Sequence, residues 1–382
     1  MSEAAGRRGV PLSDRQRLAW LRLIRSDNVG SVTFRDLINH FGSAEAAIER
    51  LPELSRRGGA GRDIRIASVA EAEAELEAAR RFGATFIGIG EPGYPPALRR
   101  IDGAPPLIAA IGDLSLAQRP AVGMVGSRNA SVSGTKFAAR LAREIGAAGY
   151  AIASGLARGI DAAAHAASLG TGTIAALAGG LDQPYPPENL DLYAEIRAGK
   201  GLAISEMPMG WEARARDFPR RNRLIAGVAL GVVVIEAAER SGSLITARRA
   251  GDFGRLVFAV PGSPLDPRAA GANGLIKDGA IMVTEARDVL DALAPLSRMS
   301  PPDAPLMEET EAMGGDEMRA PDEDERARVL SALGPTPVQI DDVVRHTGLP
   351  AQLVYYVLLE LDLAGRLDRH SGGLVSLEYP QT

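Results

Sequence analysis

Short, nearly continuous apolar runs alternate with amphipathic segments through the middle of the chain. In the amphipathic segments 134–149 and 157–170, apolar residues recur at helical spacing. The apolar runs, rich in Val, Ile and Ala, are 121–126, 150–155, 173–180, 202–206, 231–237 and 255–262, with 280–285 as a candidate seventh. Buried strands separated by helices are typical of a parallel sheet covered on both faces. We therefore expect an α/β core with a doubly wound, Rossmann-like parallel sheet and extra strands from 86–113 at its edge.

The segment before this core has the pattern of short helices. Its apolar positions at helical spacing are Leu18, Leu21, Ile24, Phe34, Leu37 and Ile38. A glycine-containing hairpin, 28–34, separates the two groups, so we expect a helical SAM-like or helix-hairpin-helix domain. Such domains bind nucleic-acid backbones through the hairpin amides or act as protein-protein modules. The absence of Lys and Arg from this hairpin favours the second role.

The last sixty residues have the pattern of a winged helix, with three helices followed by a hairpin. The third helix, 351–364, is the candidate recognition helix. It offers Gln352 but no Lys or Arg, and it carries Glu360 and Asp362. Helices that read duplex DNA present Arg, Lys, Asn or Gln to phosphates and bases. We therefore expect a protein-contact or packing role for this helix rather than the reading of a duplex.

Composition separates these domains. The stretch 297–325 is rich in Pro, Gly and acidic residues and has no apolar period, so we expect a flexible linker there. The predicted organisation is a helical domain at 1–75, an extended Rossmann-like DNA-binding domain at 76–296, the linker at 297–325 and a winged-helix domain at 326–382.

The net charge of −5 is unevenly distributed. From residue 301 onward there are 6 Arg, no Lys and 16 acidic residues, whereas residues 1–300 carry 37 basic and 32 acidic residues. A mildly basic body can accept a polyanion. The chain has no Cys, no apolar signal-peptide core and no run long enough to cross a bilayer. We expect a soluble, cytoplasmic protein with no contact with a membrane and no disulfide.

Small residues follow several of the predicted strands at one edge of the sheet. In open parallel sheets ligands bind beyond the carboxyl ends of the strands, and small residues there let backbone amides approach an anion. The segments that follow strands include Gly126, Ser127, Arg128, Ser154 and Gly155, and hydroxyl groups are available from Ser127, Ser133, Ser243 and Thr246. Several such loops on one edge predict an anion-binding pocket or groove.

The strongest cationic cluster lies in the segment DFPRRNRLIAG, which contains Arg220, Arg221, Asn222 and Arg223. Cations are unfavourable at a helix N-terminus because they oppose the helix dipole. Their presence where we expect a helix to begin therefore indicates an anionic partner. Because side chains fan out around a helix, we expect two of the three arginines to face one ligand.

Other chemistries have weaker support. A dinucleotide site needs G-x-G-x-x-G after the first strand and a P-loop needs G-x-x-x-x-G-K-[ST], and the chain has neither. Asp161 and His165, at i and i+4, are a candidate base or half of a metal site, but a helix-capping Asp and a packed His are the simpler interpretation. Glu206 and Glu236 end strands and are candidate bases. We expect no cofactor, no metal site and no catalytic residue, and we keep a nucleotide-hydrolysing, phosphoribohydrolase-like enzyme as the alternative.

Seven ordered motifs resemble the DNA-processing protein A family (DprA/Smf). They are VGSRNAS-x-x-G, ASGLARGIDAAAH, GGLD-x-x-YPPEN, ISEMPMG, FPRRNRLIAG, VVVIEAAERSGSLITA and VPG, and they span about residues 80 to 295. The resemblance implies a Rossmann-like fold that binds single-stranded DNA, forms a homodimer and loads the RecA recombinase during natural transformation. By motif it implies DNA contacts at Gly126, Ser127, Arg128, Ser154, Gly155, Arg220, Arg221, Arg223, Ser243 and Thr246. The family's pocket lysines have few counterparts, since the chain has only Lys136, Lys200 and Lys277.

Overall fold

A computed structural model describes residues 10–298, 319–370 and 372–378. These residues form two compact units. The sheet unit contains 75–298, and the terminal unit joins 12–74 to 319–370 and 372–378. Most of the predicted linker, 299–318, lies outside the described residues. The described end of that stretch includes the start of a helix at Glu323, where Asp322 and Glu325 form a capping box.

A nine-stranded sheet runs through the sheet unit in the order β1-β2-β6-β5-β4-β3-β7-β8-β9. The seven strands from β6 to β9 are parallel, and β1 and β2 continue the sheet antiparallel beyond β6. The strands are β1 (Thr85–Gly88), β2 (Leu107–Gly112), β3 (Ala121–Gly126), β4 (Ala151–Ser154), β5 (Thr173–Ala176), β6 (Leu202–Ser205), β7 (Gly231–Ile235), β8 (Leu256–Ala259) and β9 (Ile281–Met282). The predicted fold class and the extra edge strands are confirmed.

The order of the strands creates a switch point in the middle of the sheet. From β3 the chain runs outward through β4, β5 and β6, and it then returns to the other side of β3 to form β7. At such a point successive crossovers turn to opposite faces of the sheet, which leaves a crevice beyond the carboxyl ends of β3 and β7. The loops that the sequence singled out, 126–128 and 154–155, lie at this edge.

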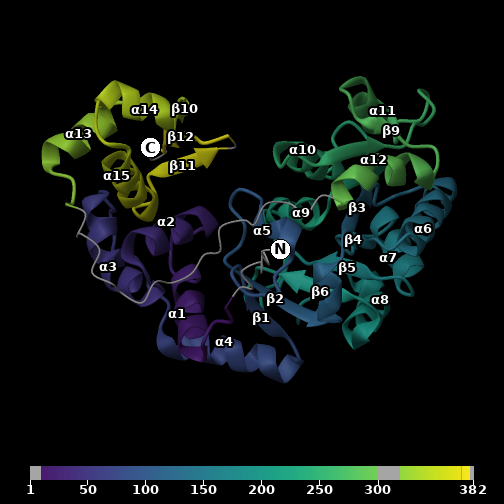
Figure 1. Ribbon diagram of the computed structural model, residues 1–382, viewed down its shortest axis with the longest axis horizontal. Helices are drawn as coiled ribbons and strands as arrows, with labels where there is room; N and C mark the ends of the chain where they lie inside the picture. Colours follow the sequence, from purple (N-terminus) through teal and green to yellow (C-terminus); the bar gives the residue numbers. More distant parts are fainter. Residues whose placement is uncertain (1–9, 299–318, 371, 379–382) are drawn as a thin grey trace, which may run out of the picture. The chain divides into compact units, whose positions relative to one another are not determined.

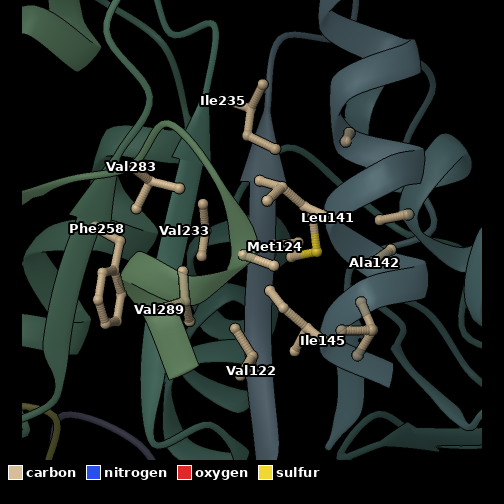
Figure 2. Close-up of a cluster of buried hydrophobic side chains, with 14 of the residues drawn as sticks. Val122, Met124, Leu141, Ala142, Ile145, Val233, Ile235, Phe258, Val283 and Val289 are labelled. Carbon is tan, nitrogen blue, oxygen red and sulfur yellow. The ribbon is translucent and has the colours of Figure 1, made fainter. Parts of the chain in front are cut away.

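Helices cover the sheet (Figure 1). They are α5 (Pro96–Arg99), α6 (Val132–Ala147), α7 (Ile160–Ser168), α8 (Leu190–Glu195), α9 (Asp217–Val228), α10 (Ser243–Asp252), α11 (Ala270–Lys277) and α12 (Ala286–Arg298), with the short turns η1 (Leu114–Gln118), η2 (Pro187–Asn189) and η3 (Ile196–Lys200). Helix α4 (Val69–Phe82) contains the boundary between the two units. In the core shown in Figure 2, Val122 and Met124 of β3 face Leu141 and Ile145 of α6. This packing holds β3, and therefore the loop after it, in a fixed position.

The terminal unit contains both flanking domains predicted from the sequence. Its helices are α1 (Asp14–Ile24), α2 (Ser31–Phe41), α3 (Ala44–Arg57), α13 (Glu323–Ser331), α14 (Ile340–Thr347) and α15 (Ala351–Leu363). Its small antiparallel sheet has the order β10-β12-β11, formed by β10 (Val338–Gln339), β11 (Leu367–His370) and β12 (Leu374–Leu377). The helical and winged-helix predictions are confirmed, and β10 is an addition to them.

Helix α15, the candidate recognition helix, packs against α2 and α3. The Asn28 Nδ2 atom donates to the Leu363 carbonyl oxygen at 2.9 Å, and the Thr33 hydroxyl donates to Asp362 at 2.7 Å. Arg369 bridges Asp362 at 2.9 Å and Asp36 at 3.0 Å. These contacts join the hairpin of the helical domain to the end of α15, so α15 has a packing role within the terminal unit.

Candidate anion-binding site

The loop after β3 is clamped between β7 and the start of α7. The amide of Ser127 faces the Ile235 carbonyl oxygen at 3.4 Å, and the Ile160 amide donates to the Ser127 carbonyl oxygen at 3.2 Å. Gly159 has a φ of +74°, and a Cβ atom there would overlap the Ser127 carbonyl oxygen, so only glycine fits. The backbone from which the exposed Arg128 side chain extends is therefore rigid.

The loop after β4 is held by a buried carboxylate. The Asp161 Oδ2 atom accepts from the Gly155 amide at 3.1 Å and the Ala157 amide at 3.4 Å. Asn189 donates to the Leu156 carbonyl oxygen at 2.8 Å. Leu156 has a φ of +57°, which is uncommon for a residue other than glycine and requires support from its surroundings. These hydrogen bonds supply that support.

His165 completes the support of this loop. Its Nε2 atom accepts from the Leu156 amide at 3.2 Å, and its Nδ1 atom lies 2.7 Å from the Thr173 hydroxyl, which itself donates to the Ile152 carbonyl oxygen. The network therefore needs a neutral imidazole with its proton on Nδ1. Burial lowers the pKa of His165 to about 3, and burial raises the pKa of Asp161. The pair that the sequence offered as a candidate base or metal site holds the loop instead, in agreement with the simpler interpretation.

Arg221 lies buried beneath the loop after β4. Its side chain is 5% exposed, and a Cβ atom at position 155 would overlap its Nη1 atom, so Gly155 is what makes room for the guanidinium group. Within the described residues, its Nε and Nη1 atoms have no hydrogen-bond partner. Burial lowers the pKa of Arg221, and the nearby Asp161 carboxylate opposes that shift. Unfilled donors on a buried cation are costly and indicate a place for an acceptor.

A phenylalanine ring brings Arg221 and Arg128 together. The Cζ atoms of Arg128 and Arg221 lie 5.2 Å and 5.6 Å from the centroid of the Phe218 ring. Asp217, the first residue of α9, fixes this end of the helix by accepting from the Trp211 indole at 2.9 Å. In the part of the chain that the structure describes, no carboxylate lies within 4.0 Å of either guanidinium group. Two adjacent cations, neither in a close ion pair, make this a candidate anion-binding position at the sheet edge.

The other basic and amide residues of α9 have different surroundings. Arg223 pairs with Glu206 at 2.5 Å and also donates to the Gly103 carbonyl oxygen, so its charge is used within the protein. Arg220 is exposed, with its Nε atom 4.0 Å from Glu206. Asn222 faces the Gly242 carbonyl oxygen at 3.4 Å. The cluster predicted from sequence thus separates into a buried, a paired and an exposed arginine.

The predicted hydroxyl donors lie in contacts within the protein. The Ser154 hydroxyl is buried and donates to the Met124 carbonyl oxygen at 2.6 Å, and Thr246 is buried in α10. The Ser243 hydroxyl lies 2.7 Å from that of Ser241, and the Ser133 hydroxyl lies 2.8 Å from that of Ser131. The structure therefore brings together Gly126, Ser127, Arg128, Gly155 and Arg221, and not the full predicted set.

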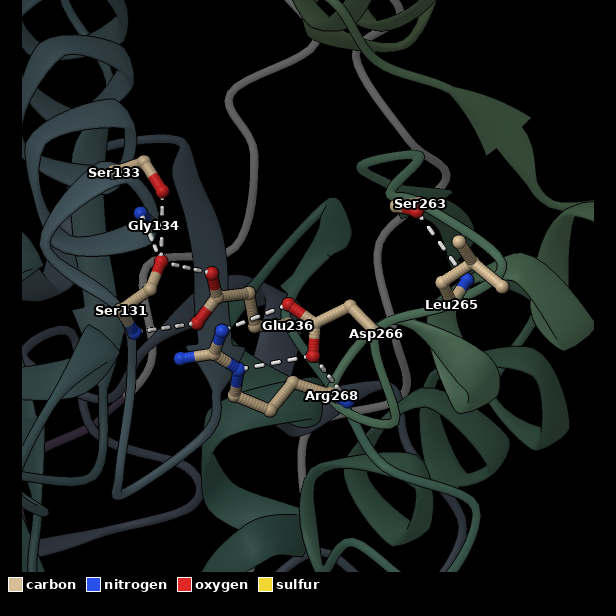
Figure 3. A network of polar contacts seen from close by, with 8 residues as sticks. All are labelled: Ser131, Ser133, Gly134, Glu236, Ser263, Leu265, Asp266 and Arg268. Carbon is tan, nitrogen blue, oxygen red and sulfur yellow. Dashed lines mark hydrogen bonds and ion pairs between the residues drawn. The ribbon is translucent and has the colours of Figure 1, made fainter.

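The N-terminus of α6, where a Rossmann-like fold usually places a phosphate, is filled by Glu236 (Figure 3). The Glu236 carboxylate accepts from the Ser131 amide at 2.8 Å and from the Ser131 hydroxyl, which in turn caps α6 by accepting from the Gly134 amide at 2.9 Å. A pocket of about 480 Å³ opens beside it, with Glu236 and Asp266 among its walls. Asp266 is paired with Arg268 at 2.8 Å, whereas the Glu236 carboxylate takes the place at the helix N-terminus and disfavours a nucleotide phosphate there.

Two aromatic residues of the candidate site, Phe218 and Tyr185, were not among the site residues predicted from the sequence. Phe218 is half-buried between the two arginines, and Tyr185, from the loop after β5, meets it edge to face with the ring centroids 6.0 Å apart. Both aromatic residues belong to quoted motifs, YPPEN and FPRRNRLIAG, and aromatic residues beside an arginine cluster were the available signal.

In the described residues, no group of three or more His, Asp or Glu side chains is placed to hold a metal ion. Nor does any helix described there combine the length and apolar character needed to span a bilayer.

Comparisons with known proteins point in one direction. The family model for DNA recombination-mediator protein A matches residues 85–294, the model for the DprA-like N-terminal helix-hairpin-helix domain matches 14–78, and the DprA winged-helix model matches 316–373. Protein Smf from Synechocystis sp. is 31% identical over 393 residues, covering 94% of this chain and 98% of that protein.

Two solved structures are similar as well. The structure of DNA processing protein A from Streptococcus pneumoniae has a TM-score of 0.58 at 33% identity and covers 74% of this chain and 98% of that one. DNA processing protein A from Helicobacter pylori, which binds single-stranded DNA, has a TM-score of 0.51 at 26% identity and covers 56% of this chain and 96% of that one.

Proposed function

Because the chain belongs to the DNA recombination-mediator protein A family (DprA/Smf), we propose that it is a single-stranded DNA-binding recombination mediator. It protects incoming single strands and loads the RecA recombinase onto them during natural transformation. One observation in the sheet unit supports the binding step: the buried Arg221 keeps two unfilled donors beside the exposed Arg128, with no carboxylate within 4.0 Å in the described residues. A strand phosphate supplies the acceptor and the counter-charge together.

The test is fluorescence anisotropy of labelled oligo(dT) over a range of salt concentrations. Each phosphate contact on a single strand contributes about 0.7 to the slope of log K against log salt. Arg128→Ala should lower affinity about tenfold and reduce that slope by about 0.7. Arg143→Ala is the matched control, because Arg143 is also exposed but lies about three turns along α6. Equal affinities and slopes for wild type and Arg128→Ala would overturn the role of Arg128.

The two candidate bases of the enzymatic alternative both make contacts within the protein. Glu206 is paired with Arg223, and Glu236 caps α6 through Ser131. A phosphoribohydrolase-like enzyme needs a carboxylate facing its substrate. Incubation with nucleoside monophosphates, with free base measured by chromatography, should show no release above a buffer control. Release at enzymatic rates would reinstate the alternative.

RecA loading and homodimer formation through the Rossmann-like domain rest on family membership. Light scattering coupled to gel filtration should give twice the 40.1 kDa chain mass. Addition of the protein should shorten the lag with which RecA assembles on a strand already covered by single-strand-binding protein. A monomer in solution, or an unchanged lag, would remove the corresponding part of the proposal.

A further inference from the structure

An exposed tyrosine stands beside the two cations of the site. Tyr185 lies in the loop after β5 and is 54% exposed. Its ring meets Phe218 edge to face, with centroids 6.0 Å apart and an interplanar angle of 69°. Phe218 in turn lies within 5.6 Å of the guanidinium carbons of Arg128 and Arg221. More than half of the Tyr185 surface is therefore exposed beside the ring that contacts both arginines.

The loop that carries Tyr185 is fixed by its neighbours. Within it, the Gly180 amide donates to the Trp211 carbonyl oxygen at 2.9 Å, and the Asp182 carboxylate accepts from the Gly210 amide at 2.8 Å. The Tyr193 hydroxyl donates to the Leu181 carbonyl oxygen at 2.5 Å. An aromatic side chain on a fixed loop loses little conformational entropy when it binds a ligand.

Charge and an open aromatic ring are the two elements of single-strand recognition. Cations follow the phosphate backbone, and aromatic rings stack on bases regardless of their identity, because every base has a π-face. Phe218 is half-buried and already faces the guanidinium groups, so it has less free surface than Tyr185. The Arg128 Cζ atom and the Tyr185 ring centroid both lie within 6.0 Å of the Phe218 ring centroid, so we expect a nucleotide whose phosphate binds Arg128 to bring its base near Tyr185.

We propose that Tyr185 is a stacking platform for a base of the strand whose phosphate binds at Arg128 and Arg221. The inference rests on the proposed single-stranded DNA binding and adds a contact to the bases, which the cations cannot provide. Stacking on Tyr185 would add to the affinity for DNA a contribution that requires bases and does not change with salt concentration.

The experiment compares two probes of equal length, oligo(dT) and an abasic strand with the same number of phosphates, by anisotropy against wild type, Tyr185→Ala and Tyr185→Phe. Tyr185→Ala should lower the affinity for oligo(dT) about tenfold with an unchanged salt slope, and it should leave the affinity for the abasic strand unchanged. Tyr185→Phe, which keeps the ring, should bind as wild type does. Tyr355→Ala is the control, because Tyr355 is a similarly exposed tyrosine of the terminal unit.

The remaining outcomes separate this inference from the proposed function. An equal loss of both probes would show that Tyr185 only positions Phe218 and the arginines, and it would overturn stacking. Unchanged binding of oligo(dT) by Tyr185→Ala would overturn it as well, while wild-type binding and the Arg128→Ala effect would still support the proposed function. Absence of oligo(dT) binding by wild type would overturn both. Thermal unfolding of each variant confirms that the fold is retained.

Discussion

The edge of the sheet unit and the α15 interface of the terminal unit both contain arginines, but they use them differently. At the sheet edge, Arg128 and Arg221 share an aromatic ring and lie beyond 4.0 Å of every carboxylate in the described residues. At the α15 interface, Arg326 forms two hydrogen bonds to Glu360 at 2.7 Å and 2.8 Å, and Arg369 bridges two aspartates. The first region keeps its cations available, whereas the second neutralises them.

This difference indicates that the arginines of the sheet edge serve binding, whereas those of the α15 interface serve stability. An arginine paired with a buried carboxylate stabilises the fold because its removal leaves a charge without a partner. An arginine without a counter-ion contributes little to the fold and remains able to bind an external anion. Helix-hairpin-helix and winged-helix outlines therefore do not by themselves indicate a DNA-binding surface.

The largest expected effect is a loss of stability at low pH, caused by protonation of His165 beneath the loop after β4. The pKa of His165 is about 3 in the folded protein, below its ordinary value of about 6.5, so its contribution to stability is fully present above pH 6.5 and is lost as the pH falls toward 3. This one group should lower the free energy of unfolding by about 1.4 kcal/mol per pH unit through most of that window. Urea unfolding at several pH values measures it. An identical pH slope for His165→Gln would contradict this assignment.

Removal of the ion pair between Arg326 and Glu360 at the α15 interface should destabilise the terminal unit. Arg326→Ala leaves Glu360, which is 1% exposed, without its partner, and should lower the free energy of unfolding by about 3 kcal/mol. Its affinity for oligo(dT) should not change while the protein is folded. The double variant Arg326→Leu/Glu360→Leu, which removes both charges, should recover most of the loss. Failure of that recovery would show that packing, and not the pair, carries the effect.

A change at the sheet edge should instead affect DNA affinity more than stability. Arg221→Met removes a buried cation whose Nε and Nη1 atoms have no partner among the described residues, but it also removes a nearby opposite charge from the buried Asp161 carboxylate, so the free energy of unfolding should fall by less than the roughly 3 kcal/mol expected for Arg326→Ala. The affinity for oligo(dT) should fall about thirtyfold, as expected for the loss of hydrogen bonds to a charged group. Calorimetry and anisotropy on the same preparation test both halves. A large stability loss with unchanged affinity would place Arg221 among the structural arginines.

The smallest expected effect compares two neighbours on α9. Arg220 is exposed and should lower the affinity for oligo(dT) only about threefold when changed to Ala, since a single solvated charge contributes little. Arg223→Ala should instead lower stability, because Glu206 is buried and loses its close partner. Anisotropy and urea unfolding distinguish them. If the two variants behave alike, the division of this cluster into exposed and paired arginines is wrong.

The fold follows from local patterns to a large extent. Alternating apolar runs and amphipathic segments predict the parallel sheet because a strand buried on both faces must be apolar throughout. Helical periodicity and turn residues likewise predict the two flanking domains. The docking of α15 on α2 and α3 could not be predicted, since it depends on contacts such as Asn28 with Leu363, far apart in the sequence.

The sequence indicates where the candidate site lies, but it does not indicate fully which residues form it. Loops 126–128 and 154–155 meet because both follow parallel strands, which the sequence indicates. Which arginine of α9 faces the loops depends on the helix phase and on Glu206, the residue after β6, which forms an ion pair with Arg223. The capping of α6 by Glu236 likewise depends on a φ of +50° at that residue, which no periodicity reveals.

The contact between residues 28–58 and α15 also sets an order of events during synthesis. The segment that forms α1, α2 and α3 leaves the ribosome first, but α15 follows it roughly 300 residues later. At about 5–20 residues per second this is a delay of about 15–60 s. During that interval the sheet unit can fold completely while the surface of α2 and α3 that α15 covers still waits for its partner. The terminal unit therefore closes only after α15 has been synthesised, later than the sheet unit can fold.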